Sequence, residues 1–198
     1  DGEEYVVNGT KTLIANGDIA DFIVVLCQTA PEAKPSYRGQ SLLIVERGSK
    51  GLKSTKIKYK LGIRASSTAE LSFTDVRVPV ANLVGEENKG FYHTLEHFNE
   101  SRVEVAAQAV GIAQGAFDRA LNYARQRKQF GQKLVDMPVI QHKLADMSIK
   151  IETARLLLYK AAWSIDKKEI DPVLSSMAKC YAGRAVSYTH LTLPTNRE

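Results

Sequence analysis

Residues 102–147 read RVEVAAQAVGIAQGAFDRALNYARQRKQFGQKLVDMPVIQHKLADM, and this stretch sets the architecture of the C-terminal half. Its first part is rich in alanine and free of proline, which predicts one long helix from Phe91 to about Gln126. Gly131 fits the stop of that helix. Pro138 fits the first turn of a second helix, where its missing N–H costs little. The stretch therefore predicts two long helices joined by a short basic connector.

The helical pattern continues beyond this stretch. Apolar residues of the second helix recur with alternating spacings of three and four, at Leu144, Met147, Ile151, Ala154 and Leu158. This spacing is typical of a stripe that is buried in a helix bundle. Asp171 and Pro172 predict the start of a third helix, which we expect to end near Val186.

The first 80 residues are typical of β structure. Asn8-Gly9 stands between two β-like runs, 5–7 and 12–14, and supplies the positive φ angles that a two-residue hairpin turn needs. Further strands are expected at 22–26, 41–46 and 71–73, with a proline-containing loop at 29–39. We predict an α+β protein, with a β domain at 1–85 and an antiparallel helix bundle at 86–186.

Composition limits the function classes. The chain has 198 residues, of which 44% are hydrophobic, enough for a packed core. A net charge of +5 suits a phosphate-bearing ligand but is too small and dispersed to indicate nucleic acid. No apolar run approaches the ~20 residues of a membrane span. Cys27 and Cys180 lack metal-ligand spacing, so we interpret them as reduced thiols of an intracellular protein.

The two ends of the sequence led to a further expectation. The chain begins at Asp1 without a methionine, in a β-like region, so we expect an N-terminal truncation. Residues 187–198 read SYTHLTLPTNRE and drop the helical pattern. They are typical of translated adapter sequence joined to a truncated gene, and we expect a non-native tail there.

Several blocks together resemble the acyl-CoA dehydrogenases, flavoenzymes that desaturate acyl thioesters. The helical part resembles their C-terminal domain. GTKTLIAN at 9–16, LGIRAS at 61–66 and FTDVRVP at 73–79 resemble their middle domain, in the same order and spacing. The resemblance covers residues 1 to about 186, roughly half of the family's usual length.

The resemblance implies a β-barrel-like middle domain followed by an antiparallel helix bundle. It also implies FAD as the cofactor, an acyl-CoA substrate, an electron-transfer flavoprotein as partner and a homotetramer. The expected compartment is the cytoplasm, or the mitochondrial matrix in a eukaryote.

The resemblance assigns a cofactor-binding role to Arg127, Gln129 and Phe130. The arginine would reach the FAD pyrophosphate of a neighbouring subunit, because a guanidinium is planar, permanently charged and bidentate toward phosphate. Gln129 would donate a hydrogen bond to the same group, and Phe130 would pack against the adenosine half. Ordinary charge capping of a helix end is the alternative for this cluster. Pro138 stands where the family usually has a glutamine that contacts FAD.

The resemblance also places Leu13, Ile14 and Ala15 beside the flavin ring. An aromatic residue and a Ser or Thr are common at the first and third of these positions, and both are aliphatic here. Backbone groups can still bond the ring edge, but a hydroxyl to flavin N5 is lost. A plain core strand is the alternative.

Asn99, Glu100, Ser101 and Arg102 match the segment that lines the acyl-CoA channel in the family. Asn99 and Arg102 would hold the CoA moiety, and residues three apart share a helix face. A simple surface charge is the alternative for Arg102. One branch of the family has its base glutamate where Ser101 stands. Glu100 is about 100° away around the helix, so we expect the base beyond the C-terminus and no catalytic residue in this chain.

His93 and His97 match the H-x-x-E-H zinc pattern, with both histidines on one helical face. The sequence does not indicate a third ligand, and the family resemblance explains this stretch without a metal. We therefore expect no metal site. The alternative function is a non-enzymatic β-plus-helix interaction module whose basic cluster binds a partner. A flavin spectrum separates the two functions.

Overall fold

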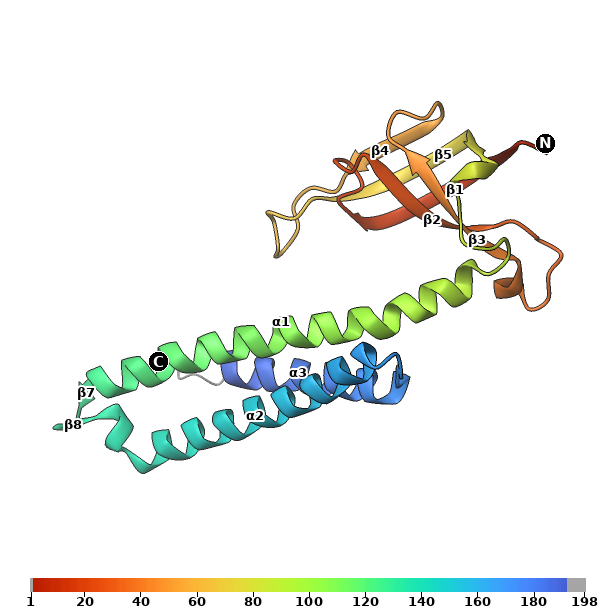
Figure 1. The fold of residues 1–198 in the computed structure, drawn as a ribbon. Helices are drawn as coiled ribbons and strands as arrows, with labels where there is room; N and C mark the ends of the chain where they lie inside the picture. The colour runs from red at the N-terminus through yellow and green to blue at the C-terminus, as the bar shows by residue number, and fades with distance from the viewer. Residues whose placement is uncertain (1, 192–198) are drawn as a thin grey trace. The chain divides into compact units, whose positions relative to one another are not determined.

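The computed structural model describes residues 2–191 (Figure 1). The chain divides into two compact units, and the division falls between Leu95 and Glu96. The first unit contains antiparallel sheets and the second contains long helices. The predicted α+β class is therefore confirmed. Within residues 2–191 no helix combines the length and the apolar character needed to cross a membrane.

The β unit contains two three-stranded antiparallel sheets. The first has the order β1 (Glu4–Ala15), β5 (Thr68–Pro79) and β4 (Leu52–Lys56). The second has the order β2 (Phe22–Gln28), β3 (Gln40–Glu46) and β6 (Leu83–Val84). Short 3-10 helices lie at Ser36–Gly39, Val80–Asn82 and Leu134–Asp136.

The two sheets share one hydrophobic core. Its buried residues come from inward-facing positions of both sheets: Val7, Val25, Leu43, Val45, Leu71, Phe73, Val76 and Val78. Within residues 2–191 the strands form no closed barrel, because β1 and β2 are both edge strands and do not pair with each other. The barrel-like form that we expected is therefore corrected to a pair of open sheets.

The predicted hairpin at Asn8-Gly9 is wrong. β1 runs through both residues, and its pairing with β5 shifts register between Val7 and Gly9. The Asn8 side chain pairs with Asp75 instead. Its Oδ1 accepts from the Asp75 backbone N at 2.8 Å, and its Nδ2 donates to the Asp75 carboxylate at 3.0 Å. Gly9 takes a φ of 143°. Between the Val7–Val76 and Gly9–Phe73 pairs β5 holds one residue more than β1, so the dipeptide lies opposite a β-bulge of β5 rather than in a turn.

The second unit packs three helices, α1 (Gly90–Gln126, whose first turns belong to the β unit), α2 (Pro138–Asp166) and α3 (Pro172–Leu191). The predicted end of α1 and the predicted starts of α2 and α3 are confirmed. Asp171 caps α3, because its Oδ1 accepts from the backbone N of Val173 at 2.8 Å and of Leu174 at 3.1 Å.

The apolar stripe of α2 is buried as predicted, except that Leu144 is only half-buried. Part of it joins a core with α1 and α3, whose buried members are Val103, Ala106, Val110, Ala154, Leu158, Ala161, Leu174, Ala178, Ala182 and Ala185. Small residues predominate in this core, which lets the helices approach closely.

The predicted end of α3 near Val186 is wrong, because the helix continues to Leu191. Thr189 is fully buried, and its hydroxyl donates to the Ala185 carbonyl at 2.9 Å. The Lys150 ammonium lies 3.8 Å from the Tyr188 ring centre. A threonine that bonds its own helix can occupy a buried position, so the change in composition does not end the helix. The remainder of the expected tail, residues 192–198, lies outside the described residues.

Candidate functional site

A short hairpin follows α1 and carries the basic cluster. β7 (Lys128–Gln129) pairs with β8 (Gln132–Lys133), and the Leu134 N donates to the Arg127 carbonyl at 2.9 Å at the hairpin base. Phe130 and Gly131 form the turn, with φ values of 51° and 78°. Two successive positive φ angles define the tight turn that matches strand twist. A positive φ is unusual for phenylalanine and often accompanies a functional position.

The hairpin presents its side chains to solvent. Arg127 and Gln129 are exposed, and the Phe130 side chain is 88% exposed. Arg125, Lys128 and Lys133 are exposed around them. The guanidinium and ammonium groups can bind a phosphate, and the exposed aromatic ring between them can stack on an aromatic base. The hairpin therefore suits a nucleotide-like ligand or a second protein surface.

The segment at Leu13 forms a bulge in β1. Lys11 pairs with Leu71 and Ile14 with Ala69, so β1 holds one residue more than β5 over this interval. Leu13 has a φ of 60°, and its side chain is 71% exposed. Ala15 is exposed too, whereas Ile14 packs on the core of the β unit. The segment thus exposes the aliphatic side chains of Leu13 and Ala15, on which a flat ring system can stack.

One turn of α1 brings Asn99 and Arg102 together. The Arg102 Nη1 donates to the Asn99 Oδ1 at 2.6 Å, and both side chains are half-buried. The Ser101 hydroxyl donates to the Phe98 carbonyl at 3.4 Å. Glu100 is exposed. The shared face that we predicted for Asn99 and Arg102 is therefore present.

These three regions are divided between the two units. The Leu13 bulge belongs to the first unit, and the other two regions belong to the second. Arg102 and the hairpin are separated by most of α1, a rise of about 36 Å at ~1.5 Å per residue. They cannot contact the same phosphate within one chain.

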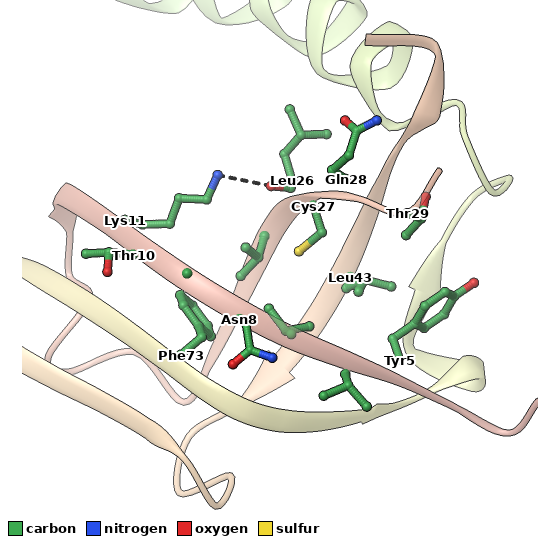
Figure 2. A pocket seen from close by; sticks show the side chains of 14 residues that line it. Tyr5, Asn8, Thr10, Lys11, Leu26, Cys27, Gln28, Thr29, Leu43 and Phe73 are labelled. Carbon is green, nitrogen blue, oxygen red and sulfur yellow. Dashed lines mark hydrogen bonds between the residues drawn. The ribbon is translucent and has the colours of Figure 1, made fainter. Parts of the chain in front are cut away.

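A cavity of about 440 Å³ opens in the β unit between β1 and β2 (Figure 2). The Lys11 Nζ donates to the Leu26 carbonyl at 3.0 Å and so links the two strands there. Burial raises the pKa of the Cys27 thiol, and the Lys11 ammonium acts in the opposite direction. None of the predicted site residues lines this cavity. A thiol held neutral is a weak nucleophile, so the cavity carries no catalytic assignment.

His93 and His97 do not belong to a metal cluster in the structure. Across residues 2–191 no three His, Cys, Asp or Glu side chains gather in a way that could hold a metal ion. We therefore assign no metal centre to this part of the chain.

Models of two domains from the same protein family match successive parts of this chain. The model of the family "Acyl-CoA dehydrogenase, C-terminal domain" matches residues 88–191, and that of "Acyl-CoA dehydrogenase, middle domain" matches residues 1–76. Cyclohexane-1-carbonyl-CoA dehydrogenase of Geobacter metallireducens is 45% identical over 185 residues, which cover 93% of this chain and 48% of that protein.

Two further comparisons extend this result. Subunit CarC of the caffeyl-CoA reductase-Etf complex of Acetobacterium woodii is 39% identical over 91% of this chain and 47% of its own length. The crystal structure of an acyl-CoA dehydrogenase from Geobacillus kaustophilus superposes with a TM-score of 0.92 and 38% identity, covering 98% of this chain and 51% of that one. The chain spans about half the length of these relatives.

Proposed function

This chain belongs to the acyl-CoA dehydrogenase family, and from that premise we propose that it serves the FAD-dependent α,β-desaturation of an acyl-CoA thioester. Family membership implies a flavin cofactor. The observation that carries the proposal is the half-buried Asn99–Arg102 pair, which lies within the matched C-terminal domain model. In the reaction the α-carbon loses a proton and the β-carbon loses a hydride. When bound, the flavin accepts that hydride.

The hairpin would hold the FAD pyrophosphate. Arg127 would donate to phosphate oxygens in the bidentate way that a guanidinium allows, and Gln129 would add an amide donor. The exposed Phe130 ring would pack against the adenosine half. Exposure of all three side chains supports a role toward a ligand of a neighbouring subunit.

The Leu13 bulge would support the flavin ring. Leu13 and Ala15 are exposed and aliphatic, so they fit the face of a flat ring and exclude water from it. They supply no hydroxyl to the ring. Any hydrogen bond from this segment must therefore come from its backbone.

Asn99 and Arg102 would bind the CoA moiety. The guanidinium spends one N–H on Asn99 and retains others, which can bond phosphate or carbonyl oxygens. Because Asn99 orients it, less side-chain entropy is lost when CoA binds. Glu100 and Ser101 would line the same channel entrance.

We do not assign the catalytic base to this helix turn. A base for the α-proton must be a carboxylate within hydrogen-bond reach of it. Ser101 is neutral, and its hydroxyl donates to a backbone carbonyl. Glu100 lies about 100° away around the helix, so a carboxylate outside residues 99–102 would remove the proton.

The electron acceptor we propose is an electron-transfer flavoprotein, and the assembly a homotetramer. The name of the A. woodii relative places that protein in an Etf complex, which supports the first proposal. The exposed hairpin supports the second, since about 36 Å separates it from Arg102 within one chain. We propose FAD as the flavin because the donors of the hairpin, Arg127 and Gln129, suit a pyrophosphate group.

A FAD titration of the purified chain tests the proposal. Binding should shift the visible flavin absorption and quench its fluorescence, and CoA should bind to the same sample. A chain that takes up neither ligand while remaining folded by circular dichroism would favour the non-enzymatic interaction module instead.

A further inference from the structure

The turn that follows the Leu13 bulge is tied to the start of β5. The Asn16 N donates to the Ser67 carbonyl at 2.9 Å, and Ala15 pairs with Thr68 in the sheet. The Gly17 N donates back to the Ile14 carbonyl at 3.3 Å. The backbone of the turn thus begins directly where the bulged segment ends.

A side-chain hydrogen bond closes the same turn. Ser67 is buried, and its hydroxyl donates to the Asp18 Oδ1 at 2.5 Å. Arg47 holds the turn from the other side. Its Nη2 donates to the Asp18 carbonyl at 3.1 Å, and its Nη1 donates to the Ile19 carbonyl at 3.0 Å. A hydrogen bond from a hydroxyl to a carboxylate is stronger than a hydrogen bond between two neutral groups.

Gly17 shows how tightly the turn packs on the strands. A Cβ at this position would lie 3.3 Å from the Cβ atoms of both Ala69 and Ile14. Ile14 is the half-buried residue between the exposed Leu13 and Ala15. A displacement of the turn would therefore press on the bulged segment itself.

We propose that Ser67 and Asp18 form a clamp that holds residues 12–15 in the shape that presents Leu13 and Ala15 to the flavin. Both act as positioning residues, since they work through the bulge. This inference rests on the proposed function, because only that function assigns the bulge to a flavin. In the sequence Asp18 precedes β2 and Ser67 follows β4, so the chain must fold through β2, β3 and β4 before the two residues can meet. The flavin-facing shape therefore depends on the complete β unit.

Hydrogen exchange combined with FAD titration tests the clamp. The variants are Ser67→Ala and Asp18→Ala, with Asp18→Asn as a partial rescue because its amide oxygen can still accept from Ser67. Ser66→Ala is the matched control, one residue from Ser67. We expect exchange within residues 12–17 to rise about tenfold in the first two variants, from the loss of a charge-assisted bond. FAD affinity should fall by a similar factor, and the control should match the wild type.

The double variant Ser67→Ala/Asp18→Ala should be no worse than either single variant, because both remove the same bond. Unchanged exchange at 12–17, or fully additive losses, would overturn the clamp. Faster exchange with unchanged FAD affinity and unchanged visible circular dichroism of the flavin would overturn its positioning role. A wild-type chain that takes up no FAD would instead refute the proposed function, and the positioning role with it. Thermal melts of each variant separate these effects from global unfolding.

Discussion

The Arg102 guanidinium donates a 2.6 Å hydrogen bond to the Asn99 amide oxygen, one turn earlier on α1. Both side chains are half-buried, so the bond forms in a partly desolvated place, where it is stronger than in water. The pair fixes the direction of a charge before any ligand arrives. Such preorganisation lowers the entropic cost of binding.

Asn99→Ala should weaken CoA binding although Arg102 keeps its charge. The loss of one hydrogen bond to a charged group, about 1.5–3 kcal/mol, predicts an increase of about ten- to a hundredfold in Kd. Isothermal titration with CoA measures it. Gln108→Ala, at an exposed position of the same helix, is the control and should leave Kd unchanged. Equal Kd values for both variants would remove Asn99 from the site.

Arg127→Ala should reduce FAD affinity about ten- to a hundredfold, because it removes a charge-assisted contact to pyrophosphate. Arg125→Ala is the matched control, since that arginine is also exposed and lies in the last turn of α1. Flavin fluorescence during titration gives both constants. If the two variants bind FAD equally, the hairpin acts through net charge alone.

Asp171→Ala should destabilise α3 by about 1 kcal/mol, because two backbone N–H groups lose their cap. Thermal unfolding measures the change. Glu169→Ala, an exposed carboxylate two residues earlier, controls for charge and should leave Tm near the wild-type value.

Tyr188→Ala should lower the free energy of unfolding by about 0.5–2 kcal/mol, because the Lys150 ammonium lies against the ring. Tyr123→Ala, at a side chain that is 60% exposed, is the control. Denaturant titration compares them. An unaffected Tyr188→Ala would mean that the last turns of α3 contribute little to the fold.

Acid should weaken the Asp18 contribution to stability. The Ser67 hydrogen bond lowers the pKa of the Asp18 carboxyl below its ordinary 3.8, burial opposes this, and the charges of Lys56 and Arg47 assist it. Because the folded pKa is the lower one, the unfolded chain binds more protons in this range. The contribution is therefore present above 3.8 and lost as pH falls through the folded pKa.

Asp18→Asn should remove this pH dependence. The difference in unfolding free energy between the wild type and Asp18→Asn should shrink steadily as the solution is acidified from pH ~5. Denaturant titrations at several pH values measure it. A constant difference across that range would contradict the assignment.

Local chemistry was enough to predict the helical half. Pro138 and Asp171-Pro172 mark helix starts through effects that act within one turn, and the structure places both starts there. The stripe through Met147 and Ile151 follows directly from helical periodicity. The Asn99–Arg102 pair lies within a single turn of α1, so it too could be predicted from spacing.

The β unit depended on partners far away in the chain. Asn8-Gly9 carries the local signal of a turn, but Asn8 pairs with Asp75 and the strand continues. Leu52–Lys56 has little apolar alternation, and it becomes β4 only because β5 offers it an edge. The last turns of α3 likewise depend on burial of Thr189.

The Leu13 bulge and the Ser67–Asp18 bond arise from the register between β1 and β5 and from the turn packed on it. Sequence patterns report periodicity and caps, which are short-range. Register and bulges are set by the simultaneous packing of side chains from both strands, and therefore appear only when the chain is folded.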